Sequence, residues 1–184
     1  IILLGEIRDK ETAEIAIQAG QTGHYVLSTI HTTDAIEAIT RLRKLNISNY
    51  DISSVVATSI SQRLVRKVCP KCSYQREFTG EEKDTINKVA RRYGIEFDFT
   101  NKKTYETKGC EYCNNTGYYG RIGIFEILIL TPEIREAIAN NKSSLDIKKM
   151  AESTNYRPLA VDGLCKVVNG ITTLNELNKK LMLY

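Results

Sequence analysis

Two polar side chains with catalytic potential follow short apolar runs near the start of this 184-residue chain. Glu6 comes directly after IILLG, and His31 comes directly after YVLSTI. A carboxylate at the end of a buried strand can orient or deprotonate an attacking water, or hold Mg²⁺, and a neighbouring imidazole can sense a terminal phosphate. The alternative is that Glu6 only caps the next helix and His31 is an ordinary loop histidine. Spacing alone leaves both interpretations open.

The segments around these residues predict a strand, a helix and a second strand. Residues 1–4 form an unbroken apolar run, which is typical of a strand buried on both faces of a parallel sheet. Asp9 is a suitable N-cap for the helix, and residues 25–30 predict the second buried strand. Glu6 and His31 then lie at the carboxyl ends of strands, the edge where open α/β sheets bind ligands.

Four cysteines form two matched C-x-x-C pairs, Cys69 with Cys72 and Cys110 with Cys113, separated by 37 residues. Two such knuckles offer four thiolates, which complete a tetrahedral zinc site. Disulfides and a redox C-x-x-C are the alternatives, but a redox motif does not explain two pairs. A zinc ion closed by four protein ligands has no open position for water, so we predict a structural zinc. The fifth cysteine, Cys165, fits core packing in a helix.

Composition restricts the class of protein. The net charge of +4 is small and the basic residues are scattered among acids, which argues against nucleic-acid binding. No apolar run approaches the roughly 20 residues of a membrane span. The first apolar run has no basic segment before it, as a signal peptide would. A chain that opens on a buried strand is expected to start inside a domain.

The segment GEIRDKETAEIAIQAGQTGHYVLSTIHTTDA closely resembles the Walker B and histidine-box region of secretion ATPases of the PilB/GspE family. These are the motors of type IV pilus assembly and type II secretion. The resemblance implies that Glu6 is the catalytic carboxylate and that His31 reaches towards the γ-phosphate. His24 matches the first histidine of this segment, where a structural role and a direct role are equally open.

Three more positions match family segments on the nucleotide-binding side. Gln62 and Arg63 match the QRL segment, although a solvated helix end remains the favoured alternative for both. The run CEYCNNTGYYGRIGIFE resembles the family signature C-x-x-C-x-x-T-G-Y-x-G-R-x-G-I-x-E. The resemblance places Arg121 near the nucleotide; the alternative is a surface arginine paired with Glu126. Glu126 itself matches the signature, but no chemistry follows for it.

We therefore predict an α/β protein: a partial RecA-like P-loop ATPase core with a tetracysteine zinc-binding insertion and an α-helical C-terminal subdomain. The core with Walker B and the histidine box covers residues 1–68, and the insertion covers residues 69–113. The chain returns to the core over 114–130, and the helical subdomain covers 131–184. The individual patterns predict a strand over 122–130, a solvated edge over 102–108, and helices over 35–45, 52–64, 81–92 and 159–168.

No G-x-x-x-x-G-K-[ST] loop occurs in these residues, and such a loop is what cradles the phosphates in P-loop ATPases. We expect a C-terminal part of a larger motor that is inactive alone. The resemblance implies a structural zinc, with Mg²⁺ and ATP bound by the parent protein. It also implies a homo-hexamer, cytoplasmic and peripheral at the inner face of the cell membrane, with an integral platform protein as its partner.

The tetracysteine element resembles assembly and secretion motors rather than retraction motors of the PilT type. The sequence leaves open whether the apparatus is a type IV pilus, a type II secretion system or a competence system. Two other classes remain: a zinc-ribbon binding module, including one for nucleic acid, and a non-catalytic structural member of a motor complex. The basic and aromatic residues that nucleic-acid binding needs are sparse around the knuckles.

Overall fold

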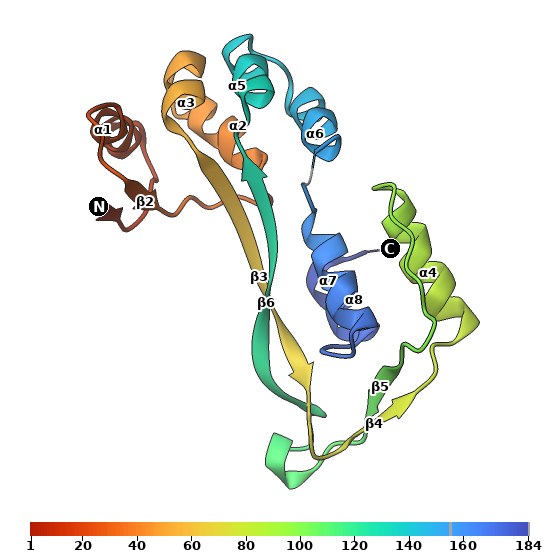
Figure 1. Ribbon diagram of the computed structural model, residues 1–184. Coiled ribbons are helices and arrows are strands. Elements are labelled where there is room, and N and C mark those ends of the chain that lie inside the picture. The colour runs from red at the N-terminus through yellow and green to blue at the C-terminus, as the bar shows by residue number, and fades with distance from the viewer. Residues whose placement is uncertain (155, 184) are drawn as a thin grey trace. The chain divides into compact units, whose positions relative to one another are not determined.

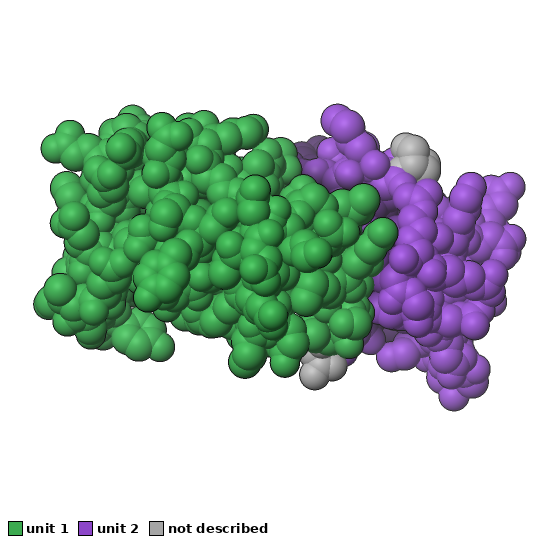
Figure 2. Space-filling model, turned by 90° about the horizontal axis from the view of Figure 1, so that it is seen from above, with its two compact units in different colours: residues 1–61, 126–156 green, residues 62–125, 157–184 purple. Residues whose placement is uncertain are grey.

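The computed structural model describes residues 1–154 and 156–183, which form two units that alternate along the chain. Unit 1 comprises residues 1–61 and 126–156, and unit 2 comprises residues 62–125 and 157–184 (Figure 2). The chain leaves unit 1 within one long strand and returns within another (Figure 1). These strands, β3 (Thr58–Val68) and β6 (Tyr118–Ile129), pair with each other as a sheet.

Unit 1 begins with the predicted order of strand, helix and strand. The three elements are β1 (Ile2–Leu4), α1 (Lys10–Gln21) and β2 (Val26–Ser28). The two strands are parallel, with Ile2 opposite Val26. Asp9 caps α1 as predicted, because its Oδ1 accepts a 2.8 Å hydrogen bond from the Thr12 N–H. Both strands therefore end at the same edge of the sheet.

The expectation that these two strands are buried on both faces is wrong for the described residues. The side chain of Leu3 is 81% exposed and that of Leu27 is 54% exposed. Within the described part of the chain β1 pairs with β2 alone, so this sheet is two strands wide and no layer covers these side chains. An apolar run predicts that a strand can be buried, but burial also requires neighbouring elements.

Four further helices pack around the hydrophobic core of unit 1. They are α2 (Glu37–Lys44), α3 (Asn49–Val55), α5 (Pro132–Ala139) and α6 (Ser144–Glu152). The largest core side chains are at most 1% exposed: Ile39, Ile52, Leu128, Ile134 and Ile147. Burying each of them contributes about 1.5–3 kcal/mol. Because Leu128 comes from β6, the end of that strand is anchored in this core.

The helix predicted over 52–64 is wrong beyond Val55, because the chain from Thr58 onward forms β3. In this strand Ser61 and Val65 are the buried residues, at 6% and 0% exposure. The helix prediction rested instead on apolar residues at helical spacing, and the last two of them, Ile60 and Leu64, are 61% and 48% exposed on β3. Gln62 and Arg63 therefore lie on a strand rather than at a helix end.

Unit 2 is built around a short hairpin-like sheet and three helices. Its further elements are β4 (Ser73–Arg76), α4 (Gly80–Arg91), β5 (Thr104–Thr107), the 3₁₀ turn η1 (Glu111–Cys113), α7 (Leu159–Val168) and α8 (Leu174–Leu181). β4 and β5 are antiparallel, with Ser73 opposite Thr107. The segment 102–108, predicted as a solvated edge, thus contains a strand, and its Thr104 is 2% exposed.

The core of unit 2 draws on both its long strands and its helices. β3, α4, β6, α7 and α8 each contribute at least one side chain that is 0% exposed, including Val65, Ile86, Ile124, Leu164 and Leu177. Helices α7 and α8 pack side by side (Figure 1). The longest described helices have 12 residues, and none of the described helices is long and apolar enough to cross a membrane.

Candidate functional site

The carboxyl ends of β1 and β2 bring Glu6 and His31 into contact. The His31 Nε2 atom lies 2.9 Å from Glu6 Oε1. The pairing continues past the strands, since the Ile7 N–H donates a 2.8 Å hydrogen bond to the Thr29 carbonyl. The side chain of Glu6 is 18% exposed and that of His31 is 88% exposed. The carboxylate is therefore sheltered, while the imidazole is open to a ligand.

Arg8 is a second partner of the Glu6 carboxylate and was not predicted. Its Nε atom lies 2.5 Å from Glu6 Oε2, and its own carbonyl accepts a 3.4 Å hydrogen bond from Nη2 of Arg41 on α2. Both carboxylate oxygens thus have a nitrogen neighbour, and each retains a lone pair that can accept a hydrogen bond from water. The only sequence signal for this contact is a basic residue two positions after the acid.

The segment carrying His31 enters α2 through a closely bonded turn. Asp34 Oδ1 accepts a 2.7 Å hydrogen bond from the Glu37 N–H, as expected of a capping residue. The Glu37 carboxylate reaches back to Thr33, accepting from its hydroxyl and, at 3.0 Å, from its N–H. These hydrogen bonds lower the pKa of Glu37, and the bond from the Thr33 hydroxyl has the largest effect. The turn is therefore internally rigid.

His24 has a local set of contacts at the end of α1. Its Nδ1 atom lies 3.2 Å from the Ala19 carbonyl and 3.2 Å from the Thr22 hydroxyl oxygen. The Thr22 hydroxyl in turn donates to the Ala19 carbonyl at 3.0 Å. These contacts occupy carbonyl groups that a helix end leaves without intrahelical partners. These contacts give His24 a structural role in the turn that ends α1.

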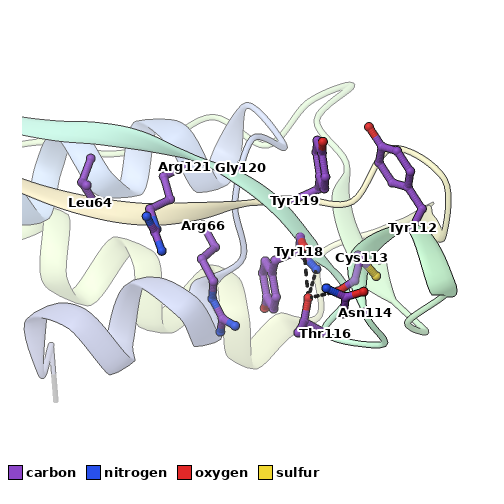
Figure 3. Close-up of a pocket in the computed structure, with 10 residues that line it drawn as sticks. All are labelled: Leu64, Arg66, Tyr112, Cys113, Asn114, Thr116, Tyr118, Tyr119, Gly120 and Arg121. Carbon is purple, nitrogen blue, oxygen red and sulfur yellow. Dashed lines mark hydrogen bonds between the residues drawn. The ribbon is translucent and has the colours of Figure 1, made fainter.

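The other three predicted nucleotide contacts lie in unit 2. Gln62 and Arg63 are on β3 and Arg121 is on β6, and all three side chains are exposed. Arg121 lines an open hollow together with Arg66 and Tyr118 (Figure 3). Arg121 and Glu126 do not form the surface pair given as the alternative, because Glu126 is buried, at 4% exposure. These exposed side chains are available to a ligand.

The two C-x-x-C knuckles bring all four cysteine sulfurs within 4.8 Å of one another. The Sγ–Sγ distances include 3.9 Å between Cys69 and Cys110, 3.8 Å between Cys72 and Cys113, and 3.7 Å between Cys110 and Cys113. Four sulfurs at about 2.3 Å from a tetrahedral zinc lie about 3.8 Å apart. The donor set and its spacing therefore fit a zinc ion.

Backbone hydrogen bonds prepare the Cys113 sulfur to carry negative charge. The Cys110 and Gly117 N–H groups donate to it at 3.3 Å and 3.2 Å. Burial opposes the charge, but these hydrogen bonds outweigh it and lower the pKa of Cys113 to about 6. Burial and hydrogen bonding to the other thiols raise the pKa of Cys72 to about 12. A bound cation favours the thiolate form of every ligand.

Glycines at two positions allow the second knuckle to close. Gly109 has φ +85°, and a Cβ there would lie 2.8 Å from the Asn115 carbonyl oxygen. Gly117 has φ +77°, and its Cβ would lie 2.3 Å from the Thr107 hydroxyl oxygen. Only glycine combines this backbone conformation with the absence of a side chain. The glycine-rich signature around the cysteines therefore has a steric basis.

An aromatic pair lies beside this knuckle and was not predicted. The rings of Tyr112 and Tyr119 (Figure 3) have centroids 4.3 Å apart. Lys71 Nζ lies 4.3 Å from the Tyr112 centroid. Cation–π contacts at exposed sites contribute about 0.5–1 kcal/mol. Because Lys71 lies inside the first C-x-x-C and Tyr112 inside the second, this contact joins the two knuckles without using the sulfurs.

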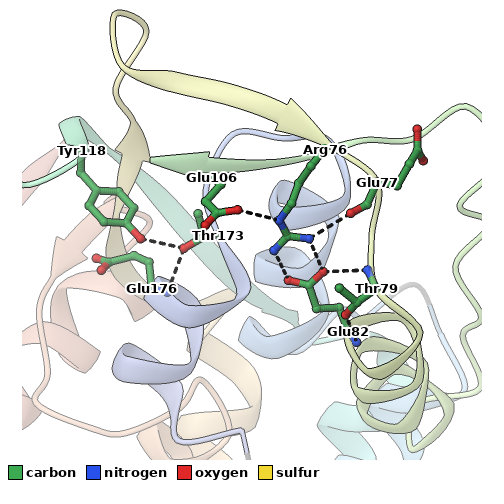
Figure 4. A network of polar contacts seen from close by, with 8 residues as sticks. All are labelled: Arg76, Glu77, Thr79, Glu82, Glu106, Tyr118, Thr173 and Glu176. Carbon is green, nitrogen blue, oxygen red and sulfur yellow. Dashed lines mark hydrogen bonds and ion pairs between the residues drawn. The ribbon is translucent and has the colours of Figure 1, made fainter. Parts of the chain in front are cut away.

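A buried ion pair fastens α8 to β3 in unit 2. Glu176 is 1% exposed; its carboxylate accepts from Arg66 Nη2 at 2.6 Å and from the Arg66 N–H at 3.2 Å. Burial opposes ionisation, but these hydrogen bonds lower the pKa of Glu176. The Arg66 guanidinium lies 4.3 Å from the Tyr118 ring centroid, and the Tyr118 hydroxyl is 2.8 Å from that of Thr173 (Figure 4).

A second network joins β4, β5 and α4. Arg76 makes two 2.7 Å hydrogen bonds to the Glu82 carboxylate, and its Nε lies 3.3 Å from Glu106 Oε2 (Figure 4). The Arg76 hydrogen bonds lower the pKa of Glu82, although burial opposes them. Glu82 also completes a capping box with Thr79 at the start of α4. The segment between the two knuckles is therefore held by polar networks as well as by apolar packing.

Comparison with known proteins adds independent information. Residues 1–179 match the family described as type II/IV secretion system protein. The type IV pilus assembly ATPase PilB of Thermus thermophilus is 43% identical over 178 residues, which cover 96% of this chain and 19% of that protein. The type II secretion system protein E of Aeromonas hydrophila is 40% identical over 178 residues, which cover 96% of this chain and 34% of that protein. The chain spans about a fifth to a third of these curated relatives.

Solved structures agree at the level of the fold. The pilus retraction motor PilT with bound ADP has a TM-score of 0.61 at 23% identity, over 97% of this chain and 38% of that chain. The ATPase DotB of Legionella pneumophila has a TM-score of 0.60 at 19% identity, over 97% of this chain and 37% of that chain. The fold is therefore shared with these two solved proteins. Since the family match extends over residues 1–179, this chain belongs to the type II/IV secretion system protein family.

Proposed function

We propose that this chain is part of an ATPase whose hydrolysis of ATP drives type IV pilus assembly or type II secretion. The family match and the names of the PilB and protein E relatives support this. Because the chain spans only a fifth to a third of those relatives, the complete catalytic cycle is assigned to a longer parent protein. That protein would supply the P-loop motif, and the 184 residues alone are expected to be inactive.

The contact between Glu6 and His31 at the strand ends carries this proposal. Glu6 is assigned to orient or deprotonate the water that attacks the terminal phosphate, and His31 to donate a hydrogen bond to that phosphate. Arg8 holds the second oxygen of Glu6 and so fixes the direction of the carboxylate. Mg²⁺ bound with ATP in the parent protein would neutralise phosphate charge; holding Mg²⁺, directly or through water, is the alternative role for Glu6. Such catalysis depends mainly on positioning and electrostatics.

Arg121 is proposed as a further contact to the nucleotide phosphates, because its guanidinium is exposed and matches the family signature. Gln62 and Arg63 are proposed as weaker contacts on the same grounds of exposure. For His24 the contacts to Ala19 and Thr22 favour a supporting role near the site over a direct contact to nucleotide.

The four-cysteine cluster is proposed to hold one structural zinc ion through Cys69, Cys72, Cys110 and Cys113. The sulfur spacing of 3.7–3.9 Å supports this. Bound zinc would hold the two knuckles together and so clamp the segment between them. The cluster has no catalytic part in the proposal, since four protein ligands complete the tetrahedron.

The parent protein is proposed to act as a homo-hexamer at the cytoplasmic face of the inner membrane. An integral platform protein would convert its conformational changes into extrusion of pilin or pseudopilin. These assignments rest on family membership and on the family resemblance of the site segments.

Steady-state Mg-ATP hydrolysis by the full-length protein tests the proposal. Glu6→Gln should lower kcat by about 10²–10⁴-fold, the usual contribution of general acid–base catalysis. The matched control is Glu11→Gln, which changes an exposed acid on α1 and should leave kcat unchanged. If the full-length protein binds zinc but shows no hydrolysis that depends on Glu6, a non-catalytic zinc-binding or structural module replaces the motor assignment.

A further inference from the structure

Glu126 is a buried carboxylate on an otherwise apolar face of β6. It is 4% exposed, and the next residues on the same face in unit 1, Leu128 and Leu130, are 1% and 3% exposed. A carboxylate in such surroundings is unfavourable unless hydrogen bonds satisfy its oxygens. The site described above makes no use of this group, so its presence among leucines needs a separate explanation.

Its Oε1 atom accepts a hydrogen bond from the backbone of the turn that follows His31. The Ala35 N–H donates a 2.8 Å hydrogen bond to Glu126 Oε1, joining residues 91 positions apart. Ala35 is 1% exposed, so water does not compete for this bond. The Tyr156 hydroxyl also hydrogen-bonds Glu126; burial and the nearby Glu126 charge raise the pKa of Tyr156, which keeps the phenol protonated as a donor. Glu126 thus connects two segments of unit 1.

The hydrogen bonds within the turn fix its conformation, but its position relative to β1 depends on contacts with other segments. Glu37 bonds to both Thr33 and Asp34, as described above. A turn held only by such local bonds could shift as one piece relative to β1. The bond from Glu126 instead ties Ala35 to a strand whose neighbouring residues are fixed in the core. Four positions separate Ala35 from His31.

We propose that Glu126 is a positioning residue for the hydrolytic site, holding the Ala35 backbone so that His31 stays within hydrogen-bond distance of Glu6. This inference rests on the proposed roles of Glu6 and His31. Glu126 acts through the turn and contacts no reacting atom. What the turn requires is an acceptor at the position of Oε1, so glutamine should serve and alanine should not.

The test compares Glu126→Ala, Glu126→Gln and Leu128→Ala in the full-length protein. Leu128→Ala is the matched control, because it empties a buried position on the same face without removing the hydrogen bond to the turn. Two quantities are measured on each variant: kcat and KM for Mg-ATP, and hydrogen–deuterium exchange of the peptide that contains Ala35. The first reports on the chemical step and the second on the anchor itself.

Glu126→Ala should lower kcat roughly 10–100-fold, the usual effect of displacing a catalytic group by about 1 Å, with KM changed by less than about threefold. It should also accelerate exchange at Ala35. Glu126→Gln should keep kcat within about threefold of the wild type and retain slow exchange, since its amide oxygen accepts the same bond. Leu128→Ala should keep kcat when assayed well below its melting temperature.

Three results would overturn the inference: wild-type kcat in Glu126→Ala, unchanged exchange at Ala35 in that variant, or equal losses in the alanine and glutamine variants. If Glu126→Ala does not fold, Glu126→Asp replaces it, because aspartate keeps the charge but shortens the reach; wild-type kcat in Glu126→Asp would then overturn it. If wild-type hydrolysis proves independent of Glu6, the proposed function fails, and the exchange of Ala35 alone decides whether Glu126 anchors the turn.

Discussion

The two candidate sites differ in how much of each lies within this chain. The cysteine cluster of unit 2 presents four sulfurs within 4.8 Å of one another, enough to complete a tetrahedral metal site. The strand-end pair of unit 1 presents one sheltered carboxylate and an imidazole that is 88% exposed. A closed set of ligands suits a structural role, whereas an open pair suits a ligand that arrives and leaves. Damage to the first should reduce stability, and damage to the second should reduce turnover.

The largest expected effect is loss of the metal from the cluster. Cys113→Ser replaces a sulfur that accepts two backbone hydrogen bonds, so zinc content should fall from about one per chain to near zero. Because structural zinc contributes directly to folding, the melting temperature should fall by roughly 10–20 °C.

Metal analysis and thermal unfolding measure both effects, and Cys165→Ser is the control. Cys165 lies on α7, outside the cluster, so its replacement should leave the zinc content unchanged. If the Cys113→Ser protein kept its full zinc content and melting temperature, the claim that the cysteine cluster is a closed structural site would be contradicted.

The next effect comes from breaking the buried ion pair of unit 2 without touching the cysteines. Arg66→Ala leaves Glu176, 1% exposed, without its cation and should cost about 2–4 kcal/mol of unfolding free energy. The lower part of that range is expected because the Arg66 side chain is 39% exposed. Urea denaturation measures the loss. Arg91→Ala, which breaks the exposed pair with Glu96, should leave the urea midpoint unchanged.

The lowered pKa values of Glu176 and Glu82 predict that the protein loses stability at acidic pH. Hydrogen bonds from Arg66 overcome burial to lower the pKa of Glu176, and those from Arg76 lower the pKa of Glu82 below the ordinary 4.5. Each contribution is therefore complete above about pH 4.5 and is lost as the pH falls through the lowered folded-state pKa. The unfolding free energy measured from pH 6 to pH 3 should fall less steeply in Glu176→Gln. Identical slopes in the variant and the wild type would contradict this.

The smallest expected effect is at the first turn of α4, between the two knuckles. Thr79→Ala removes the hydroxyl that accepts the Glu82 N–H and should destabilise the protein by about 1 kcal/mol. Thr79→Ser keeps the hydroxyl and should recover most of that loss. Urea denaturation in the presence of zinc measures both variants. An alanine variant as stable as the wild type would show that the knuckles alone hold this helix.

Much of this arrangement follows from local sequence signals. Asp9 caps α1 as predicted, and Thr131, Ser143 and Thr173, which are also residue types favoured at N-caps, cap α5, α6 and α8. The two C-x-x-C knuckles are also local, since each needs one tight turn. The apolar run over 122–130 predicted the strand β6, even though it contains Glu126.

The signals that failed depend on contacts distant in sequence. Ile60 and Leu64 continue the helical spacing of apolar residues from α3, but they lie on β3 and are 61% and 48% exposed. The exposure of Leu3 could not be foreseen from an apolar run. The Glu126–Ala35 bond spans 91 positions, and no periodicity or motif contains such a contact.

Nucleotide binding and turnover in the Glu6→Gln variant of the full-length protein test the central claim most directly. If Glu6 acts in the chemical step, the variant should bind Mg-ATP within about threefold of the wild-type affinity while kcat falls by about 10²-fold or more, with zinc content and melting temperature unchanged. If turnover persists, or if binding, zinc and stability are lost together, Glu6 is a structural residue and the open site does not perform the hydrolysis.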